Sequence, residues 1–296
     1  MTRVLSALVL LPVVIGTIWF LPPVGTLVLA LVAAVLAFRE YGTIAAALGA
    51  SVSGGIGAVA VALTCFAVWA GDRYVHTSSV PFTQGGGVSL MAGDVFKPNA
   101  VPLILMSAFL VTGAASVARG RPAASVLSDA AATMLAPIYI GLPLGALAWI
   151  REPRVYDESL HPWDPRVAVL LLLVVIVVSD SAQYYTGRAF GRRPLAPTIS
   201  PKKTVEGAIG GVVFGTLATM IGGRYVFGSP LLLLALLGAA MSLLGIVGDL
   251  FESLLKRSAG VKDSSQLIPG HGGVLDRIDS WLFAAPVYYV FVRFIA

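Results

Sequence analysis

The sequence predicts an all-α fold, a polytopic integral membrane bundle of about nine transmembrane helices. Three observations predict it. The 296 residues are 57% hydrophobic and only 12% charged, which is far more apolar than a soluble domain needs. The apolar residues gather in stretches close to the ~20 residues that cross a bilayer. These stretches lack the alternation of outer-membrane strands, and backbone groups in lipid must be satisfied internally, so helices are expected.

Each apolar stretch is a predicted spanning helix. The first is interpreted as a retained span, because it exceeds the length of a signal-peptide core and no small-residue cleavage site follows it. The second is short, and glycines in the seventh mark a place where helices approach closely. The stretches cover 4–20, 24–38, 54–71, 100–118, 131–150, 167–187, 205–223, 229–249 and 279–295.

The distribution of charge divides and orients the chain. Residues 1–166 are predicted to form an N-terminal transmembrane region of about five helices, and 167–296 a C-terminal catalytic transmembrane region. With a cytoplasmic N-terminus, most of the 20 Lys and Arg residues fall on the inner side, including those of loops 188–204 and 250–278. The C-terminus is then outside. Basic residues flank apolar stretches instead of forming one patch, so the net charge of +5 does not indicate a nucleic-acid partner.

The outer segments 72–99 and 151–166 are rich in Gly, Pro and Ser with balanced charge, and we interpret them as surface connections.

On the inner side, Asp180 follows an apolar run and is expected near the membrane boundary. An unpaired carboxylate there is unfavourable. Asp180 therefore either pairs with Arg188 or Arg192 or belongs to a functional site.

A second polar motif is Ile-Ser-Pro-Lys-Lys-Thr-Val-Glu-Gly at 199–207. Ser200 is predicted to cap a helix whose first residue is Pro201, which would leave free N–H groups and a positive dipole end. Lys202, Lys203 and Thr204 lie beside that helix start, so the motif favours a phosphate cradle. The alternative is a simple helix-surface pair of Lys203 with Glu206.

The end of the eighth stretch carries Asp249, Ser253 and Lys256 at i, i+4 and i+7, and therefore on one helical face. A surface pair of Glu252 with Lys256 is the simpler interpretation of Glu252. It does not explain Asp249, which lies deeper.

The segment 253–279 concentrates polar chemistry in an otherwise apolar chain. It contains cations, a Gly-rich turn around His271, and the carboxylates of Asp276 and Asp279, which are three positions apart and share one face if helical. Cations with paired carboxylates indicate phosphate held with a metal. His271 either caps a backbone group or contacts a phosphate or base, and the sequence leaves both open.

This segment resembles the signature of the phosphatidate cytidylyltransferases: Ser-x-apolar-Lys-Arg, four residues, Lys-Asp, then His-Gly-Gly-apolar-x-Asp-Arg-apolar-Asp. The upstream Ser-Asp, Gly-Arg-x-Phe-Gly and Ile-Ser-Pro-Lys-Lys-Thr-x-Glu-Gly resemble the same family, so the resemblance covers roughly 179–279. Ser181-Ala182-Gln183 after Asp180 departs from the family pattern, in which Thr and small residues are expected. The resemblance implies transfer of CMP from CTP to phosphatidic acid, which gives CDP-diacylglycerol and pyrophosphate. It also implies magnesium, a homodimer, and a bacterial inner membrane with the site facing the cytoplasm.

Roles follow for individual residues. Asp249 and Asp276 are expected to ligate magnesium, alone or with a second metal ion, and Asp180 and Asp279 to support them. Asp249, Asp276, Lys202 and Lys203 are the expected catalytic residues. The alternative function is a polytopic transporter of an anionic substrate, which is disfavoured because its ionisable residues would line the bundle near the midplane. The expected substrate-binding residues are Ser200, Thr204, Ser253, Lys256, Arg257, Lys262, Asp263, His271 and Arg277.

Overall fold

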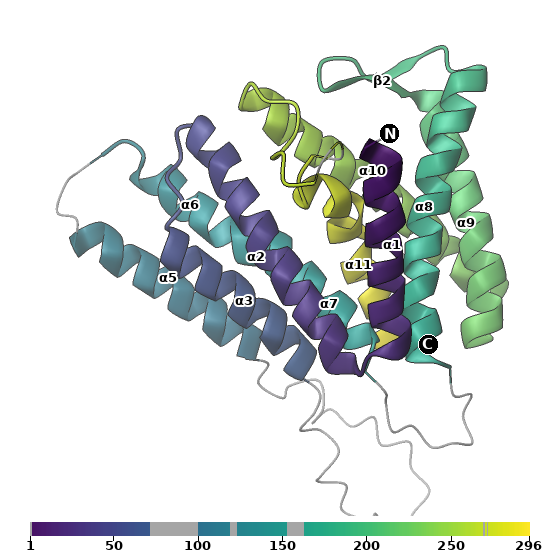
Figure 1. Cartoon of the computed structure of the whole chain (residues 1–296), viewed down its shortest axis with the longest axis horizontal. Helices are drawn as coiled ribbons and strands as arrows, with labels where there is room; N and C mark the ends of the chain where they lie inside the picture. Colours follow the sequence, from purple (N-terminus) through teal and green to yellow (C-terminus); the bar gives the residue numbers. More distant parts are fainter. Residues whose placement is uncertain (1, 72–99, 119–122, 153–162, 269, 271) are drawn as a thin grey trace, which may run out of the picture.

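The structure is a computed structural model that describes residues 2–71, 100–118, 123–152, 163–268, 270 and 272–296 (Figure 1). The predicted outer segment 72–99 lies outside the described residues, as does most of 151–166. In the described ranges every predicted apolar stretch lies in a helix, so the all-α bundle is confirmed.

The N-terminal half forms an antiparallel set of helices. A π-helical turn, η2 (Pro137–Gly141), joins two helices that run on in one direction, so the fifth apolar stretch becomes a composite span. The helices are α1 (Thr2–Phe20), α2 (Pro23–Ala47), α3 (Gly54–Ala70), α5 (Ala100–Ala118), α6 (Val126–Ala136) and α7 (Leu142–Ile150).

The C-terminal half consists of four long helices and one β-hairpin. Asp164 caps the first of these helices by accepting a hydrogen bond from the Arg166 N–H at 2.8 Å, and Pro165 occupies the first helical position. The elements are α8 (Pro165–Phe190), β1 (Pro194–Ala196), β2 (Ser200–Thr204), α9 (Val205–Phe227), α10 (Leu231–Ser258) and α11 (Leu275–Phe294).

Six helical segments of the described chain are long and apolar enough to cross a membrane: α2, α5, Val126–Ile150, α8, α9 and α10. The described apolar part of α1 and the whole of α3 are shorter. α11 carries Asp276, Arg277 and Asp279 in its first turns. The prediction of about nine spans is therefore approximate in number, although the kind of fold is correct.

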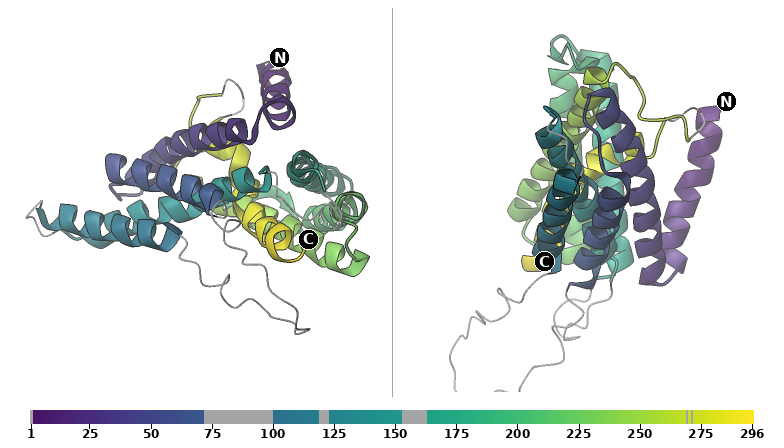
Figure 2. Two further views of the ribbon diagram at one scale, coloured as in Figure 1. Left: turned by 90° about the horizontal axis from the view of Figure 1, so that it is seen from below. Right: turned by 90° about the vertical axis from the view of Figure 1, so that its left-hand side faces the viewer.

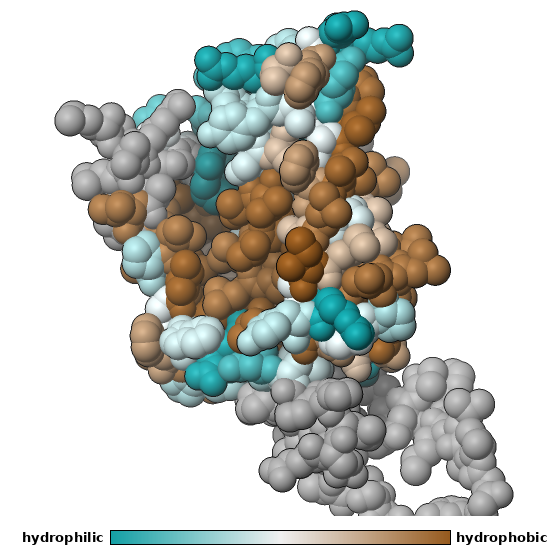
Figure 3. All heavy atoms as spheres, turned by 90° about the vertical axis from the view of Figure 1, so that its right-hand side faces the viewer, coloured by the Kyte–Doolittle hydropathy of each residue, from teal (hydrophilic) through white to brown (hydrophobic). Residues whose placement is uncertain are grey.

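The outer surface fits a bilayer. On the face shown in Figure 3, hydrophobic residues form a band between hydrophilic ends. Large side chains such as Ile209, Ile221 and Leu232 are exposed in α9 and α10. An apolar surface of this kind is expected to face lipid tails, because exposing a large continuous apolar patch to water is unfavourable.

Small residues let α8 and α9 approach closely, as the glycines of the seventh stretch predict. A side chain at Gly207 would meet the Gln183 carbonyl oxygen at 2.7 Å, and one at Gly215 would meet Ser179 Cβ at 3.2 Å. The two glycines lie on one face of α9, which packs between α8 and α10. This packing fixes the second half of α8, including Asp180, against the first half of α9.

α11 joins the two halves of the bundle. It packs against α10 of one half and α7 and α2 of the other (Figure 2). Its buried Tyr288 donates a hydrogen bond to the Ala168 carbonyl of α8 at 2.8 Å. The larger of two hydrophobic core clusters in the described chain includes residues from Ile18 to Val292, so residues of both predicted regions contribute to it.

The structure corrects the predicted helix start at Pro201. Residues 200–204 form β2, which pairs with β1 in the antiparallel register Ala196 to Ser200 and Pro194 to Thr204. The helix begins at Val205, whose N–H donates to the Arg193 carbonyl at 2.9 Å. Thr204 is the cap, because its Oγ1 accepts from the Gly207 N–H at 3.1 Å. Hairpin pairing with residues 194–196 therefore overrides the Ser-Pro capping pattern.

Candidate active site

The polar motifs meet at one end of the bundle. The end of α8, the β1–β2 hairpin, the end of α10 and the start of α11 lie at the same end as the N-terminus, and the C-terminus lies at the opposite end (Figure 1). Loops 188–204 and 250–278 therefore share one side of the molecule, as the charge distribution predicts.

The β1–β2 hairpin places Lys203 beside α10. Its ammonium group forms an ion pair with Asp249, and the Ser253 hydroxyl lies 3.4 Å from the other oxygen of that carboxylate. The predicted face of Asp249 and Ser253 is thus present. The alternative pairing of Lys203 with Glu206 is wrong, since Glu206 accepts instead from the backbone N–H groups of Arg192 and Arg193 at 3.0 and 3.2 Å.

Three of the predicted metal ligands lie close enough to interact electrostatically: Asp180, Asp249 and Asp279, on α8, α10 and α11 respectively. Asp180 accepts a hydrogen bond from Gln183 Nε2 at 3.0 Å, and Arg188 donates to the Tyr184 hydroxyl at 3.3 Å. Like charges repel, so this arrangement favours a cation. Among the described residues, no three or more His, Cys, Asp or Glu side chains converge as a ready-made metal-binding group.

Asp276 is engaged with the protein itself. Its Oδ1 pairs with the ammonium of Lys256, and its Oδ2 accepts from the Ser264 N–H at 2.9 Å and the Gly273 N–H at 2.7 Å. Asp276 lies before the apolar stretch 279–295. Burial raises the pKa of its carboxyl, but the hydrogen bonds from Lys256, Gly273 and Ser264 lower it to about 2. Asp276 is therefore ionised at neutral pH and holds the loop onto the start of α11.

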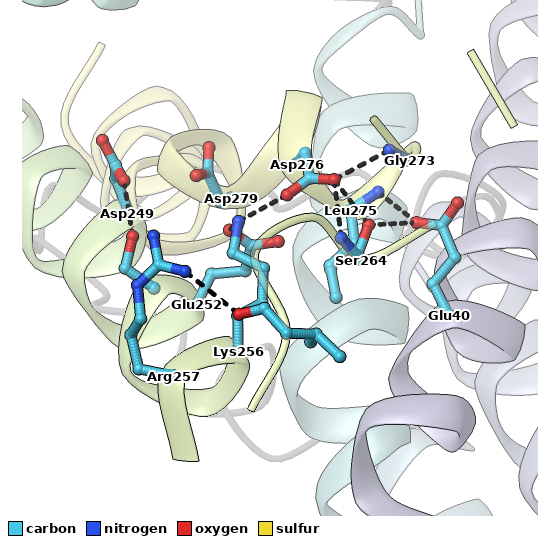
Figure 4. A network of polar contacts seen from close by, with 12 residues as sticks. Glu40, Asp249, Glu252, Lys256, Arg257, Ser264, Gly273, Leu275, Asp276 and Asp279 are labelled. Atoms are coloured by element: carbon cyan, nitrogen blue, oxygen red, sulfur yellow. Dashed lines mark hydrogen bonds and ion pairs between the residues drawn. The ribbon is translucent and has the colours of Figure 1, made fainter. Parts of the chain in front are cut away.

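Lys256 is buried between two carboxylates. It pairs with Asp276 and with Glu252, whose side chain is fully buried at 0% exposure (Figure 4). Glu252 is thus part of an internal charge network and not of an ordinary helix surface, so the surface-pair interpretation is wrong. A buried charge needs such partners, because transfer of an isolated one from water is very unfavourable.

The remaining predicted residues differ in their surroundings. Arg257 Nη1 donates to the Val261 carbonyl at 3.1 Å and so closes the turn after α10. Ser200 and Thr204 belong to β2 and its junction with α9. His271 lies outside the described residues. Of the predicted residues that the structure describes, those exposed at the surface and available to a ligand are Lys202, Arg257, Lys262, Asp263 and Arg277.

The sequence analysis missed Glu40, which lies on α2 and reaches this network from the other half of the chain. It is 5% exposed, and its carboxylate accepts hydrogen bonds from the Val274 N–H at 2.9 Å and the Leu275 N–H at 2.7 Å. The available signal was a carboxylate directly after an apolar run, since such residues need partners.

Fold and site together define a multi-pass helical membrane protein with a charged site at one end of the bundle. The chain belongs to the cytidylyltransferase family, whose family model matches residues 1–295. Lys256, Gly273 and Asp276 of the family signature take part in the charge network.

Several curated proteins are similar to this chain. A phosphatidate cytidylyltransferase of Haemophilus influenzae is 39% identical over 159 residues, which cover 50% of this chain and 54% of that protein. Phosphatidate cytidylyltransferase 5, chloroplastic, of Arabidopsis thaliana is 38% identical over 206 residues, 64% of this chain and 51% of that protein. A phosphatidate cytidylyltransferase of Helicobacter pylori is 43% identical over 129 residues, 44% and 48%. The chain spans about half the length of the curated relatives it matches.

Proposed function

We propose that the chain is a phosphatidate cytidylyltransferase, which transfers CMP from CTP to phosphatidic acid. The observation that carries this proposal is the pairing of Lys203 with Asp249 and of Lys256 with Asp276 at one end of the bundle. These pairs join β2, α10 and α11, and the family signature runs through them. The names of the relatives support the choice of CTP and phosphatidic acid as substrates.

In the proposed reaction, a phosphate oxygen of phosphatidic acid attacks the α-phosphorus of CTP. A new P–O bond forms, and the bond from the α-phosphorus to the oxygen shared with the β-phosphate breaks. Pyrophosphate leaves with that electron pair, and CDP-diacylglycerol remains in the membrane. The attacking phosphate is an anion at neutral pH, so the residues need not supply a general base. They must instead offset the repulsion between two polyanions.

The cations divide into three groups by their surroundings. Lys202, Lys262 and Arg277 are exposed, and we assign them to the triphosphate and the lipid phosphate. Lys203 is partly buried against Asp249 and is placed to contact a phosphate that enters beside that carboxylate. Lys256 is enclosed by carboxylates and serves mainly to hold Asp276.

Magnesium is the proposed cofactor. Asp249 and Asp276 are its proposed ligands, with Asp180 and Asp279 as supports, because Mg²⁺ takes hard oxygen ligands and the repulsion among Asp180, Asp249 and Asp279 favours a cation. When bound, the ion would neutralise negative charge on the reacting phosphates. Asp249 is the more available ligand, since its side chain is 32% exposed whereas that of Asp276 is 6% exposed.

The proposed setting is the inner membrane of a bacterium, with the site on the cytoplasmic face. The excess of Lys and Arg at this end of the bundle supports that orientation. A homodimer stays a prediction that rests on the family resemblance.

The test is incubation of the purified protein with cytidine-labelled CTP, phosphatidic acid and magnesium, followed by lipid extraction. The enzyme moves cytidine into the organic phase. A transporter of an anionic substrate would leave the label in the aqueous phase while moving it across proteoliposomes. Absence of label from the lipid at all magnesium concentrations would contradict the proposal.

A further inference from the structure

The carboxylate of Glu40 is satisfied entirely by one distant segment. Its Oε1 accepts from the Ser265 hydroxyl at 2.7 Å and the Val274 N–H at 2.9 Å. Its Oε2 accepts from the Leu275 N–H at 2.7 Å and lies 3.0 Å from the Ser264 hydroxyl. Each oxygen thus has two neighbours, all of them 224 to 235 positions further along the chain.

These contacts place an acidic group at the N-terminus of α11. Val274 and Leu275 lie where α11 begins, and the first N–H groups of a helix have no partner within the helix. The Glu40 carboxylate therefore caps α11 from another helix, and its negative charge lies at the positive end of the helix dipole. No side chain of 274 itself caps the helix.

Ser264 links Glu40 to the proposed active site. Its Oγ lies 3.0 Å from Glu40 Oε2 and 2.8 Å from Asp276 Oδ2, and its single proton serves one of them at a time. Asp276 in turn pairs with Lys256. Figure 4 shows this chain of contacts, with Glu40 at one end and Lys256 and Glu252 at the other.

The loop backbone comes close to Glu40 because residue 273 has no side chain. A Cβ at Gly273 would overlap Glu40 Oε2 and Ser264 Oγ. The second glycine of the His-Gly-Gly motif is therefore explained by the space that Glu40 occupies. An added methyl group there would push the loop and α2 apart.

From these contacts we infer that Glu40 is a positioning residue for the active site. It fixes Ser264 and Ser265 against the start of α11, and so sets where Asp276 and Asp279 point. The inference rests on the proposed function for its kinetic consequence, but its structural part does not depend on catalysis. Active sites need such support, because a displacement of about 1 Å can cost ~100-fold in rate.

The test compares Glu40→Gln with Arg39→Gln, an exposed neighbour on the same helix. Gln keeps the size of the side chain but turns one acceptor oxygen into an NH₂ group that faces two donors. We expect kcat to fall about tenfold to 100-fold, with the KM for CTP changed less than threefold. Amide hydrogen exchange of peptides covering 264–278 should become faster, while the melting temperature in detergent stays near that of the parent. Arg39→Gln should change none of these.

Two further variants keep the inference falsifiable. Ser265→Ala removes one donor to Glu40 and is expected to show a smaller effect of the same kind. The double variant Glu40→Gln with Ser265→Ala should be little worse than Glu40→Gln alone, because both act through one contact. If Glu40→Gln fails to fold, the inference is tested instead on Ser265→Ala and Gly273→Ala, by kcat, the KM for CTP and hydrogen exchange of peptides covering 264–278.

The outcomes separate the two claims. An inactive parent protein would contradict the proposed function, and hydrogen exchange would still report whether Glu40 holds the segment. Unchanged exchange at 264–278 in Glu40→Gln would overturn the inference, whatever the activity. Faster exchange with unchanged kcat would also overturn it, since Glu40 would then have a structural role only.

Discussion

Lys203 of β2 forms an ion pair with Asp249 of α10, which lies 46 positions further along the chain. The pair joins the hairpin to the helix bundle where the bundle meets its polar end. It also brings together two of the four residues that the sequence analysis predicts to be catalytic.

Lys203→Ala should therefore lower kcat/KM much more than Lys202→Ala. Lys203 is partly buried and leaves Asp249 unpaired when removed, whereas Lys202 is exposed. The expected loss for Lys203→Ala is about 1.5–3 kcal/mol in transition-state binding, typical of a hydrogen bond to a charged group. Steady-state kinetics with both substrates varied measures it. Equal effects of the two variants would place the phosphate contact on the exposed side of β2.

Lys256→Ala should destabilise the protein strongly. It leaves the fully buried Glu252 and the ionised Asp276 without their cation, and removal of one partner from a buried ion pair typically costs about 3–5 kcal/mol. The measurement is thermal unfolding in detergent, with Lys262→Ala as the matched control because Lys262 is exposed. Similar melting temperatures for the two variants would show that the pair contributes little.

Thr204→Val should loosen the start of α9. It removes the hydroxyl that accepts from the Gly207 N–H, and loss of an N-cap typically costs about 1 kcal/mol. Ser200→Ala should have a smaller effect on stability, since Ser200 lies in β2 and does not cap a helix. Hydrogen exchange of residues 205–210 distinguishes the variants. Faster exchange in Ser200→Ala alone would instead support the predicted helix that begins at Pro201 with Ser200 as its cap.

The orientation in the membrane is open to a labelling test. Cysteines introduced at Ser200 and Gln266 should resist an impermeant thiol reagent in intact bacterial cells, and one at Ala296 should react. The native Cys65 is buried at 0% exposure and gives little background. Labelling at either of the first two positions from outside would reverse the proposed topology.

The fold was largely predictable because a segment that crosses lipid must satisfy its backbone hydrogen bonds internally, and an apolar stretch of about 20 residues does so as a helix. The helix ends were less so. α2 runs on to Ala47, beyond the predicted end of its stretch, and contains Glu40, which is buried by partners that local hydropathy cannot detect. The β1–β2 hairpin was missed for a related reason, since the Ser-Pro pair at 200–201 is typical of a helix start and strand pairing depends on residues 194–196.

The site was predictable in composition but not in its connections. Periodicity placed Asp249 and Ser253 on one face, and the structure agrees. The partners of Asp276 lie in a loop with positive φ at Gly270 and Gly272, a backbone conformation that sequence spacing does not report. Glu40 lies more than 220 positions from its partners, so only the folded chain relates them.

The central claim is that this site transfers CMP from CTP to phosphatidic acid. Its most direct test follows the α- and γ-phosphorus atoms of CTP into the products. Purified protein is given phosphatidic acid, magnesium and CTP labelled either at the α- or at the γ-phosphorus. The proposed reaction predicts α-label in the lipid extract, γ-label in aqueous pyrophosphate, and neither product with Asp249→Asn. Retention of the α-label in water, or γ-label in the lipid, would contradict cytidylyl transfer by this site.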